Sequence, residues 1–372
     1  MTELAAGHGW NDRRRYWWPI SLVVPSLVLI AYGLVEVSGS AWFWWTGAVV
    51  IYGVVPLLDW WVGSDASNPP HAAIDGLEGD RYYRGLLLAT YPLQMLGLLV
   101  GVWVATTAEL NPLQWLGLAI TVGIVSGGGI NAAHEWGHKR GGFASLMSKL
   151  SLAPAAYGHF HVEHNRGHHK NVATPEDPAS ARLGETFWQF LPRTLIGSVR
   201  SAWRIERTRL LAQGRAVISP RNDILQAWFM TAILYAALVL VFGWAALPFL
   251  IVQAFYGAAL LEAVNYIEHY GLLRRKDSNG RYVRCEPEHS WNANQVVSNL
   301  MLYQLQRHSD HHANPRRSYQ TLRHFDDSPQ LPVGYAALIP VVHFPRIWFG
   351  LMNHRVLDHY DGDVRRANMQ PD

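Results

Sequence analysis

The sequence contains a single cysteine, Cys285, among its 372 residues. One thiol cannot build a disulfide framework, and it cannot supply the four thiolates of an iron–sulfur or rubredoxin-type centre. Haem held by a cysteine thiolate is disfavoured for the same reason. Any redox chemistry in this chain would therefore have to use other ligands.

Charged residues are scarce at 16%, whereas 49% of the residues are hydrophobic and 17 are tryptophan. The formal net charge is only +3, and we expect no nucleic-acid partner. The sequence also lacks heptads, internal repeats and low-complexity tracts. The charges are concentrated in a few segments and the apolar residues in others, which indicates a membrane protein.

Six apolar runs are each long enough to cross about 30 Å of hydrocarbon at about 1.5 Å per residue. They lie near 17–38, 41–62, 85–106, 113–133, 223–243 and 245–267. Tryptophans gather near their ends, as in the aromatic belt of membrane proteins. The sequence therefore predicts an all-α integral membrane protein with six transmembrane helices, organised as one domain over residues 1–372.

The lysines and arginines predict the orientation in the membrane. With a cytoplasmic N-terminus, the outer connections are 39–40, 107–112 and about residue 244, and none contains a lysine or arginine. All 31 basic residues then lie on the cytoplasmic side, as the positive-inside rule requires. We expect segments 134–222 and 268–372 to form a histidine-rich cytoplasmic cap.

Four short blocks on that same side contain nine histidines at metal-ligand spacing. The nine are His134, His138, His164, His168, His169, His269, His308, His311 and His312. Rings three or four residues apart share one face of a helix. A four-coordinate zinc needs at most four ligands, so nine imidazoles point to two metals. Imidazole suits zinc, copper, iron and nickel, and the spacing does not choose among them.

Polar residues in or near these blocks are predicted to support the metal site. Metal-bound imidazoles usually donate their second N–H to a carboxylate or a carbonyl. The predicted partners, or direct ligands, are Glu135, Glu163, Asp177, Asn265, Glu268 and Asp310. The alternative for each carboxylate is a solvated surface charge, and for Asn265 a hydrogen bond within the helix bundle.

The chain resembles a known family, the AlkB-type alkane 1-monooxygenases. The motifs are His-Glu-x-x-His-Lys (134–139), Glu-His-x-x-Gly-His-His (163–169), Asn-Tyr-x-Glu-His-Tyr-Gly (265–271) and Leu-Gln-Arg-His-Ser-Asp-His-His-Ala (305–313). The third motif separates this family from the wider group of membrane desaturases and hydroxylases. The resemblance runs from about residue 15 to residue 360, and Trp136 is bulkier than the small aliphatic residue expected there.

The resemblance implies a non-haem diiron enzyme of the bacterial inner membrane that oxidises the terminal methyl of n-alkanes to 1-alkanols with dioxygen. The nine histidines would then be the ligands of two iron ions. It implies no flavin, haem or iron–sulfur cluster in this chain. Electrons would come from rubredoxin, which an NAD(P)H-dependent reductase reduces. Cytoplasmic basic residues such as Lys139 and Arg140 could steer an acidic rubredoxin, although positive-inside topology explains the same charges.

An alkane offers no polar group, so its binding must come from burial of its methylenes, at roughly 0.8 kcal/mol each. A dry slot between the spans would also protect reactive intermediates from side reactions. The predicted lining residues are Ile51, Leu118, Leu260 and Leu261, on spans two, four and six. Ordinary helix packing is the alternative explanation for these four.

Other functions also fit parts of the pattern. A related membrane diiron enzyme, either a fatty-acyl desaturase or an aromatic methyl-group monooxygenase, would use the same ligands. His134-Glu135-x-x-His138 matches the zincin motif, with Glu135 as general base, so an intramembrane zinc protease is a rival. It would leave six histidines idle. A metal transporter is a further rival, but transporter sites usually lie at mid-membrane, where these spans hold few ionisable residues.

Overall fold

The structure is a computed structural model that describes residues 12–370, and this part of the chain contains helices, loops and isolated β-bridges but no β-strand. Among these residues, six helical segments are long and apolar enough to cross a membrane. They are Trp18–Ser38, Ala41–Val62, Arg81–Thr107, Pro112–Gly137, Asp223–Phe242 and Ala246–His269. The predicted fold class and all six spans are confirmed, with the third span beginning earlier and the fourth ending later than hydropathy indicates.

The first two spans are assembled from several helical pieces. The first joins the 3-10 turn Trp18–Leu22 to α2 (Val23–Ser38). The second runs through the 3-10 turn Ala41–Trp45, α3 (Thr46–Val49), the π-helical turn Val50–Val54 and α4 (Val55–Val62). The other four spans are α6 (Arg81–Thr107), α7 (Pro112–Gly137), α12 (Asp223–Phe242) and α13 (Ala246–His269).

Short polar side chains set where the spans begin. Asp80, Asn111 and Asn222 each accept a hydrogen bond from a backbone N–H in the first turn of α6, α7 and α12, respectively. These N-caps satisfy donors that have no partner within the helix. Gly39 ends α2 with a left-handed backbone at φ 70°, a conformation that glycine adopts without a steric cost. The connections between paired spans can therefore be very short.

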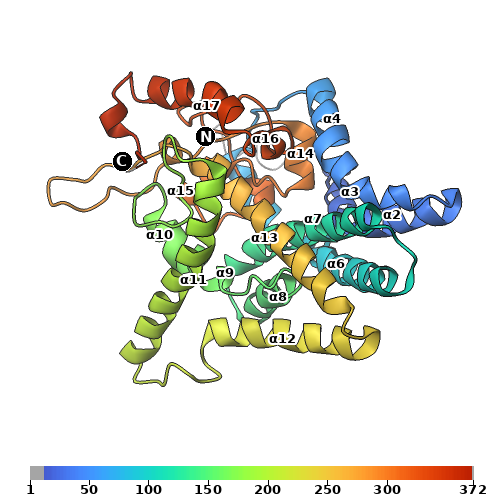
Figure 1. Cartoon of the computed structure of the whole chain (residues 1–372). Helices are drawn as coiled ribbons and strands as arrows, with labels where there is room; N and C mark the ends of the chain where they lie inside the picture. Colours follow the sequence, from blue (N-terminus) through green and yellow to red (C-terminus); the bar gives the residue numbers. More distant parts are fainter. Residues whose placement is uncertain (1–11, 371–372) are drawn as a thin grey trace.

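Helices α7 and α13 form the centre of the bundle, where they pack along each other (Figure 1). Of the most apolar stretch of α7, 83% is buried, against 17% for α12. Gly123 on α7 and Gly257 on α13 permit this close approach. A Cβ on Gly123 would lie 2.9 Å from the Gln253 carbonyl oxygen, and one on Gly257 would lie 2.9 Å from the Gly123 carbonyl oxygen. Small residues at such crossings are typical of membrane helix pairs.

Loops, short helices and one long helix, α11, make up the cap at the ends of α7 and α13. They are α5 (Ile74–Gly79), α8 (Gly142–Leu152), α9 (Phe160–Val162), α10 (His169–Asn171), α11 (Phe187–Ala212), α14 (Val296–Met301), α15 (His308–Ala313), α16 (Tyr335–Val341) and α17 (Pro345–His359). Tyr266 of α13 and Tyr270, which directly follows that helix, pack with Trp291 and Trp348 into one buried cluster that joins the cap to the bundle. The cap is therefore fixed rigidly against the histidine-bearing ends of the spans.

Candidate metal centre

Five histidines from three separate segments converge into one group, called here group 1. His134 and His138 come from the end of α7. His164 and His169 come from the segment after α9, and His311 from α15. The ligand nitrogens of all five lie within 4.8 Å of one another. The Nε2 atom of His311 lies 2.7 Å from that of His134 and 3.0 Å from that of His169.

The other four histidines converge in the same way into group 2. They are His168, His269, His308 and His312, and all four are buried. The Nε2 atom of His312 lies 2.8 Å from that of His308 and 3.2 Å from that of His168. The two groups are neighbours, since the rings of His169 and His312 have centroids 4.5 Å apart. The structure thus gathers all nine predicted histidines into two adjoining clusters.

A π-helical turn over Glu163–His168 decides which histidine joins which group. Helical spacing of four predicts that His164 and His168 share a face, but the structure separates them. The wider π turn brings residues five apart together. The Nε2 atoms of His164 and His169 are therefore 3.0 Å apart, and His168 turns toward group 2. On α15, His311 and His312 are adjacent in sequence and also diverge to different groups.

The nine ring nitrogens are chemically suited to metal ions. They face one another at 2.7 to 3.3 Å, and each Nε2–Nε2 contact can use only one proton. Burial also disfavours protonation, and together with the nearby charge of Lys139 it lowers the pKa of His138 to about 3. The same burial lowers the pKa of His169, His311 and His312. Inward-facing lone pairs on neutral imidazoles are what metal coordination requires.

Two of the predicted carboxylate partners lie directly against imidazoles of group 2. An oxygen of Asp177 is 2.9 Å from Nδ1 of His168, on the far side of the ring from its cluster nitrogen. Burial lowers the pKa of His168, but the charge of Asp177 reverses this and leaves the pKa above its usual value. An oxygen of Glu268 is 3.1 Å from Nε2 of His308, which faces the cluster. Asp177 is therefore placed to orient a ring, and Glu268 to face a metal.

The other predicted partners are buried but make different contacts. Glu135 lies 3.9 Å from the ammonium group of Lys139, and Asp310 accepts hydrogen bonds from the guanidinium of Arg317 at 2.6 and 2.8 Å. Asn265 donates to Glu262 at 3.2 Å. Glu163 lies beside the backbone of Gly167, and burial raises its pKa to about 7.

Sequence spacing alone could not distinguish Asp177 and Glu268 from the other four predicted partners, because all six lie in or close to a histidine motif. The other four are Glu135, Glu163, Asn265 and Asp310.

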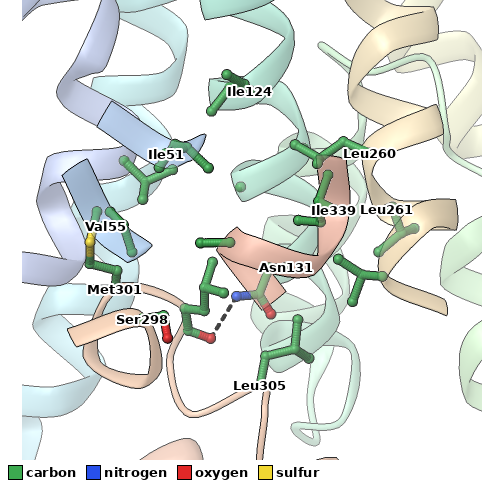
Figure 2. A pocket seen from close by; sticks show the side chains of 16 residues that line it. Ile51, Val55, Ile124, Asn131, Leu260, Leu261, Ser298, Met301, Leu305 and Ile339 are labelled. Carbon is green, nitrogen blue, oxygen red and sulfur yellow. Dashed lines mark hydrogen bonds between the residues drawn. The ribbon is translucent and has the colours of Figure 1, made fainter. Parts of the chain in front are cut away.

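A narrow apolar cavity lies between the spans beside the histidine clusters. The volume of this cavity that is open to a water-sized sphere is about 70 Å³. Its walls are formed by Val24, Ile51, Val55, Ile124, Gly127, Gly128, Asn131, Leu260, Leu261, Val264, Ser298, Met301, Leu302, Leu305, Ala336 and Ile339. Figure 2 shows Ile124 toward one end of this cavity and Leu305 toward the other. The lining is almost wholly aliphatic, as a site for an apolar chain requires.

Two residues that line the cavity lie close in sequence to histidines of the clusters. Asn131 is three residues before His134 on α7, and Leu305 is three residues before His308. Residues three apart on α7 share a face and differ by about 4.5 Å along the axis. The part of the cavity beside Asn131 therefore lies about one helical turn from His134.

Three of the four predicted lining residues, Ile51, Leu260 and Leu261, do line this cavity. Leu118 does not: it is fully buried in the apolar core with Leu98 and Val102. It lies six residues before Ile124 on α7, and so beyond the end of the cavity. Asn131, which also lines the cavity, was not predicted from the sequence, although its position one helical turn before His134 was a usable signal.

The chain matches known families along most of its length. Residues 110–341 match the family described as fatty acid desaturase. Alkane 1-monooxygenase 1 of Alcanivorax borkumensis is 46% identical over 369 residues, which cover 99% of this chain and 91% of that protein. Alkane 1-monooxygenase of Acinetobacter baylyi is 44% identical over 97% of this chain and 89% of its own length. The xylene/toluene monooxygenase hydroxylase component XylM of Pseudomonas putida is 26% identical over 68% of this chain and 67% of its own length.

Proposed function

Because the chain belongs to the alkane 1-monooxygenases, we propose that it hydroxylates the terminal carbon of n-alkanes with dioxygen at two non-haem irons. It is a multi-pass membrane enzyme that hydroxylates alkanes. The balanced reaction combines R–CH3, dioxygen, two electrons and two protons to give R–CH2OH and water. The observation that carries the proposal is the convergence of nine imidazoles, seven of them buried, in two groups close to a residue that lines an apolar cavity.

Each histidine group would hold one iron, with Glu268 as an additional oxygen ligand on the group 2 side. When bound, the two irons would supply the redox chemistry that activates dioxygen. The protein's own residues fix the geometry. Asp177 holds the His168 ring in one orientation and one tautomer, because it accepts the hydrogen bond from Nδ1 and leaves Nε2 free for coordination.

The cavity would bind the alkane by burial alone, at roughly 0.8 kcal/mol per methylene. Its aliphatic walls exclude water from the reacting end and favour an extended chain. The terminal carbon would reach the histidines first because Asn131 and Leu305 mark the end of the cavity nearest to them. Ile51 lies in the wall on the π-helical turn Val50–Val54, so its size would limit how far the rest of the chain extends.

Electrons would come from rubredoxin, because the one cysteine of this chain, Cys285, is buried and cannot form an iron centre by itself. We infer from the positive-inside rule that the cap and the histidines face the cytoplasm, and we propose the bacterial inner membrane as the location. Some basic residues of the cap are already engaged. Arg166 pairs with Glu206, Arg317 pairs with Asp310, and Arg274 is buried. Exposed residues such as Arg140 and Arg316 remain for an acidic partner.

The decisive test is to supply iron-loaded protein in lipid with reduced rubredoxin and dioxygen, and to offer it octane, dodecane and xylene separately. The proposal predicts 1-octanol and 1-dodecanol as products. A methyl-hydroxylated xylene as the only product would instead favour the aromatic methyl-group monooxygenase, and a double bond in an acyl substrate would favour a desaturase. A single zinc ion per chain and no oxygenated product would refute the proposal.

A further inference from the structure

Only two of the sixteen residues that line the apolar cavity, Asn131 and Ser298, carry a polar side chain. The hydroxyl oxygen of Ser298 accepts a hydrogen bond from Nε2 of Gln306 at 2.7 Å. The Ser298 side chain is thus engaged within the cap. Asn131 is different, because only one end of its side-chain amide is used.

Asn131 donates a hydrogen bond from Nδ2 to the carbonyl oxygen of Leu302 at 2.8 Å (Figure 2). This contact fixes the orientation of the amide, since the carbonyl can only accept. The other end is therefore Oδ1, and no group in the described part of the chain donates to it. Asn131 is 6% exposed and lines the cavity. An acceptor that no protein group satisfies can be completed by a donor on a ligand in the cavity.

The position of this acceptor matters for the reaction. Asn131 lies one helical turn before His134, at the end of the cavity nearest the histidine clusters. An n-alkane cannot donate a hydrogen bond, so Oδ1 contributes nothing to substrate binding. The hydroxyl group of a primary alcohol can donate one, and the reaction places that hydroxyl on the terminal carbon.

We propose that Asn131 forms a binding subsite for the product, in which Oδ1 accepts the O–H of the newly formed 1-alkanol. This inference rests on the proposed function, because it assumes that the hydroxyl is formed at the terminal carbon. Asn131 is then a positioning residue that holds the product by its head while the cavity holds the tail. Its consequence is product inhibition that depends on the hydroxyl group and not on chain length alone.

The test uses the full-length, iron-loaded enzyme in lipid nanodiscs, with dodecane as substrate. Two inhibitors are compared: 1-dodecanol, and 1-chlorododecane, which has a polar head but no donor. In Asn131→Leu, the inhibition constant of 1-dodecanol should rise about three- to tenfold, the value of one net hydrogen bond. The inhibition constant of 1-chlorododecane should change by less than about twofold, because its head has no donor and the burial of its tail is unaffected.

Ser298→Ala is the matched control, since it removes the other polar side chain of the cavity and should leave the ratio of the two inhibition constants unchanged. Asn131→Ala serves as a second variant if the leucine disturbs packing beside Leu302. Equal weakening of both inhibitors and of dodecane would show that Asn131 is only structural, and an unchanged ratio would likewise overturn the subsite. A wild-type enzyme that oxidises no dodecane would instead refute the proposed function itself.

Discussion

The two histidine groups have similar geometry but different surroundings. Group 1 has five imidazoles, two of them half-buried, and His138 also lines a polar surface pocket with Lys139 and Arg140. Group 2 has four fully buried imidazoles, and the carboxylates of Asp177 and Glu268 contact it. Group 1 therefore relies on the number of its neutral ligands, whereas group 2 relies on fewer ligands supported by negative charge. The two irons would have unequal affinities and unequal access to solvent.

The largest expected effect is a difference in iron content between two variants, each of which lacks one histidine of one group. His312→Ala leaves three imidazoles in group 2, whereas His138→Ala leaves four in group 1. We expect the iron content to fall from two to about one per chain in His312→Ala and to stay near two in His138→Ala, because four ligands still form a complete site. Elemental analysis of the purified proteins measures this. Equal losses in both variants would show that the groups do not act as two separate sites.

The next effect tests the carboxylate support of group 2. Asp177→Asn keeps the shape of the side chain but removes the charge beside His168, and it should weaken iron binding at that group about 10- to 100-fold. Iron titration of the apoprotein measures the affinity. Glu185→Gln is the control, because Glu185 is a buried carboxylate paired with Arg193 and contacts no imidazole. If both variants weaken iron binding equally, the loss is a general destabilisation of the cap.

A smaller effect concerns the solvent-facing side of group 1. If an acidic rubredoxin approaches the exposed basic residues near His138, turnover at low rubredoxin concentration should fall several-fold as salt rises from about 0.05 to 0.5 M, since screening shortens the reach of surface charges. Steady-state rates at fixed rubredoxin concentration measure this. Arg316→Gln should reduce the salt dependence without changing the iron content. Turnover that does not respond to ionic strength would contradict electrostatic steering.

The smallest expected effect concerns the apolar cavity between the spans. Ile51→Trp places a larger ring in the wall and should shift the preferred alkane to a shorter chain, with little change for the shortest substrates. Product yields over a series from octane to hexadecane measure the shift. Leu118→Phe is an instructive comparison, because Leu118 lies outside the cavity in the apolar core. It should reduce stability without changing the chain-length profile, and an unchanged profile in Ile51→Trp would remove Ile51 from that role.

The sequence predicted the spans well because the thickness of the bilayer sets the length of an apolar helix, and this length and its hydropathy can be seen in the local sequence. It also predicted which histidines gather, since each motif follows the end of a span or lies in the cap. The sequence did not predict which histidines belong to which group, because the π turn at Glu163–His168 changes which residues share a face. The place of Leu118 was equally out of reach, since it depends on which neighbouring helices pack against that side chain.

The most direct test is the metal content of the wild-type chain combined with Mössbauer spectroscopy of the iron-loaded enzyme. Two irons per chain are expected, with two distinguishable signals of equal area, one from a site of imidazoles alone and one from a site that also contacts carboxylate. One zinc per chain, or one iron with a single signal, would contradict the claim that nine histidines hold two irons at the end of the cavity.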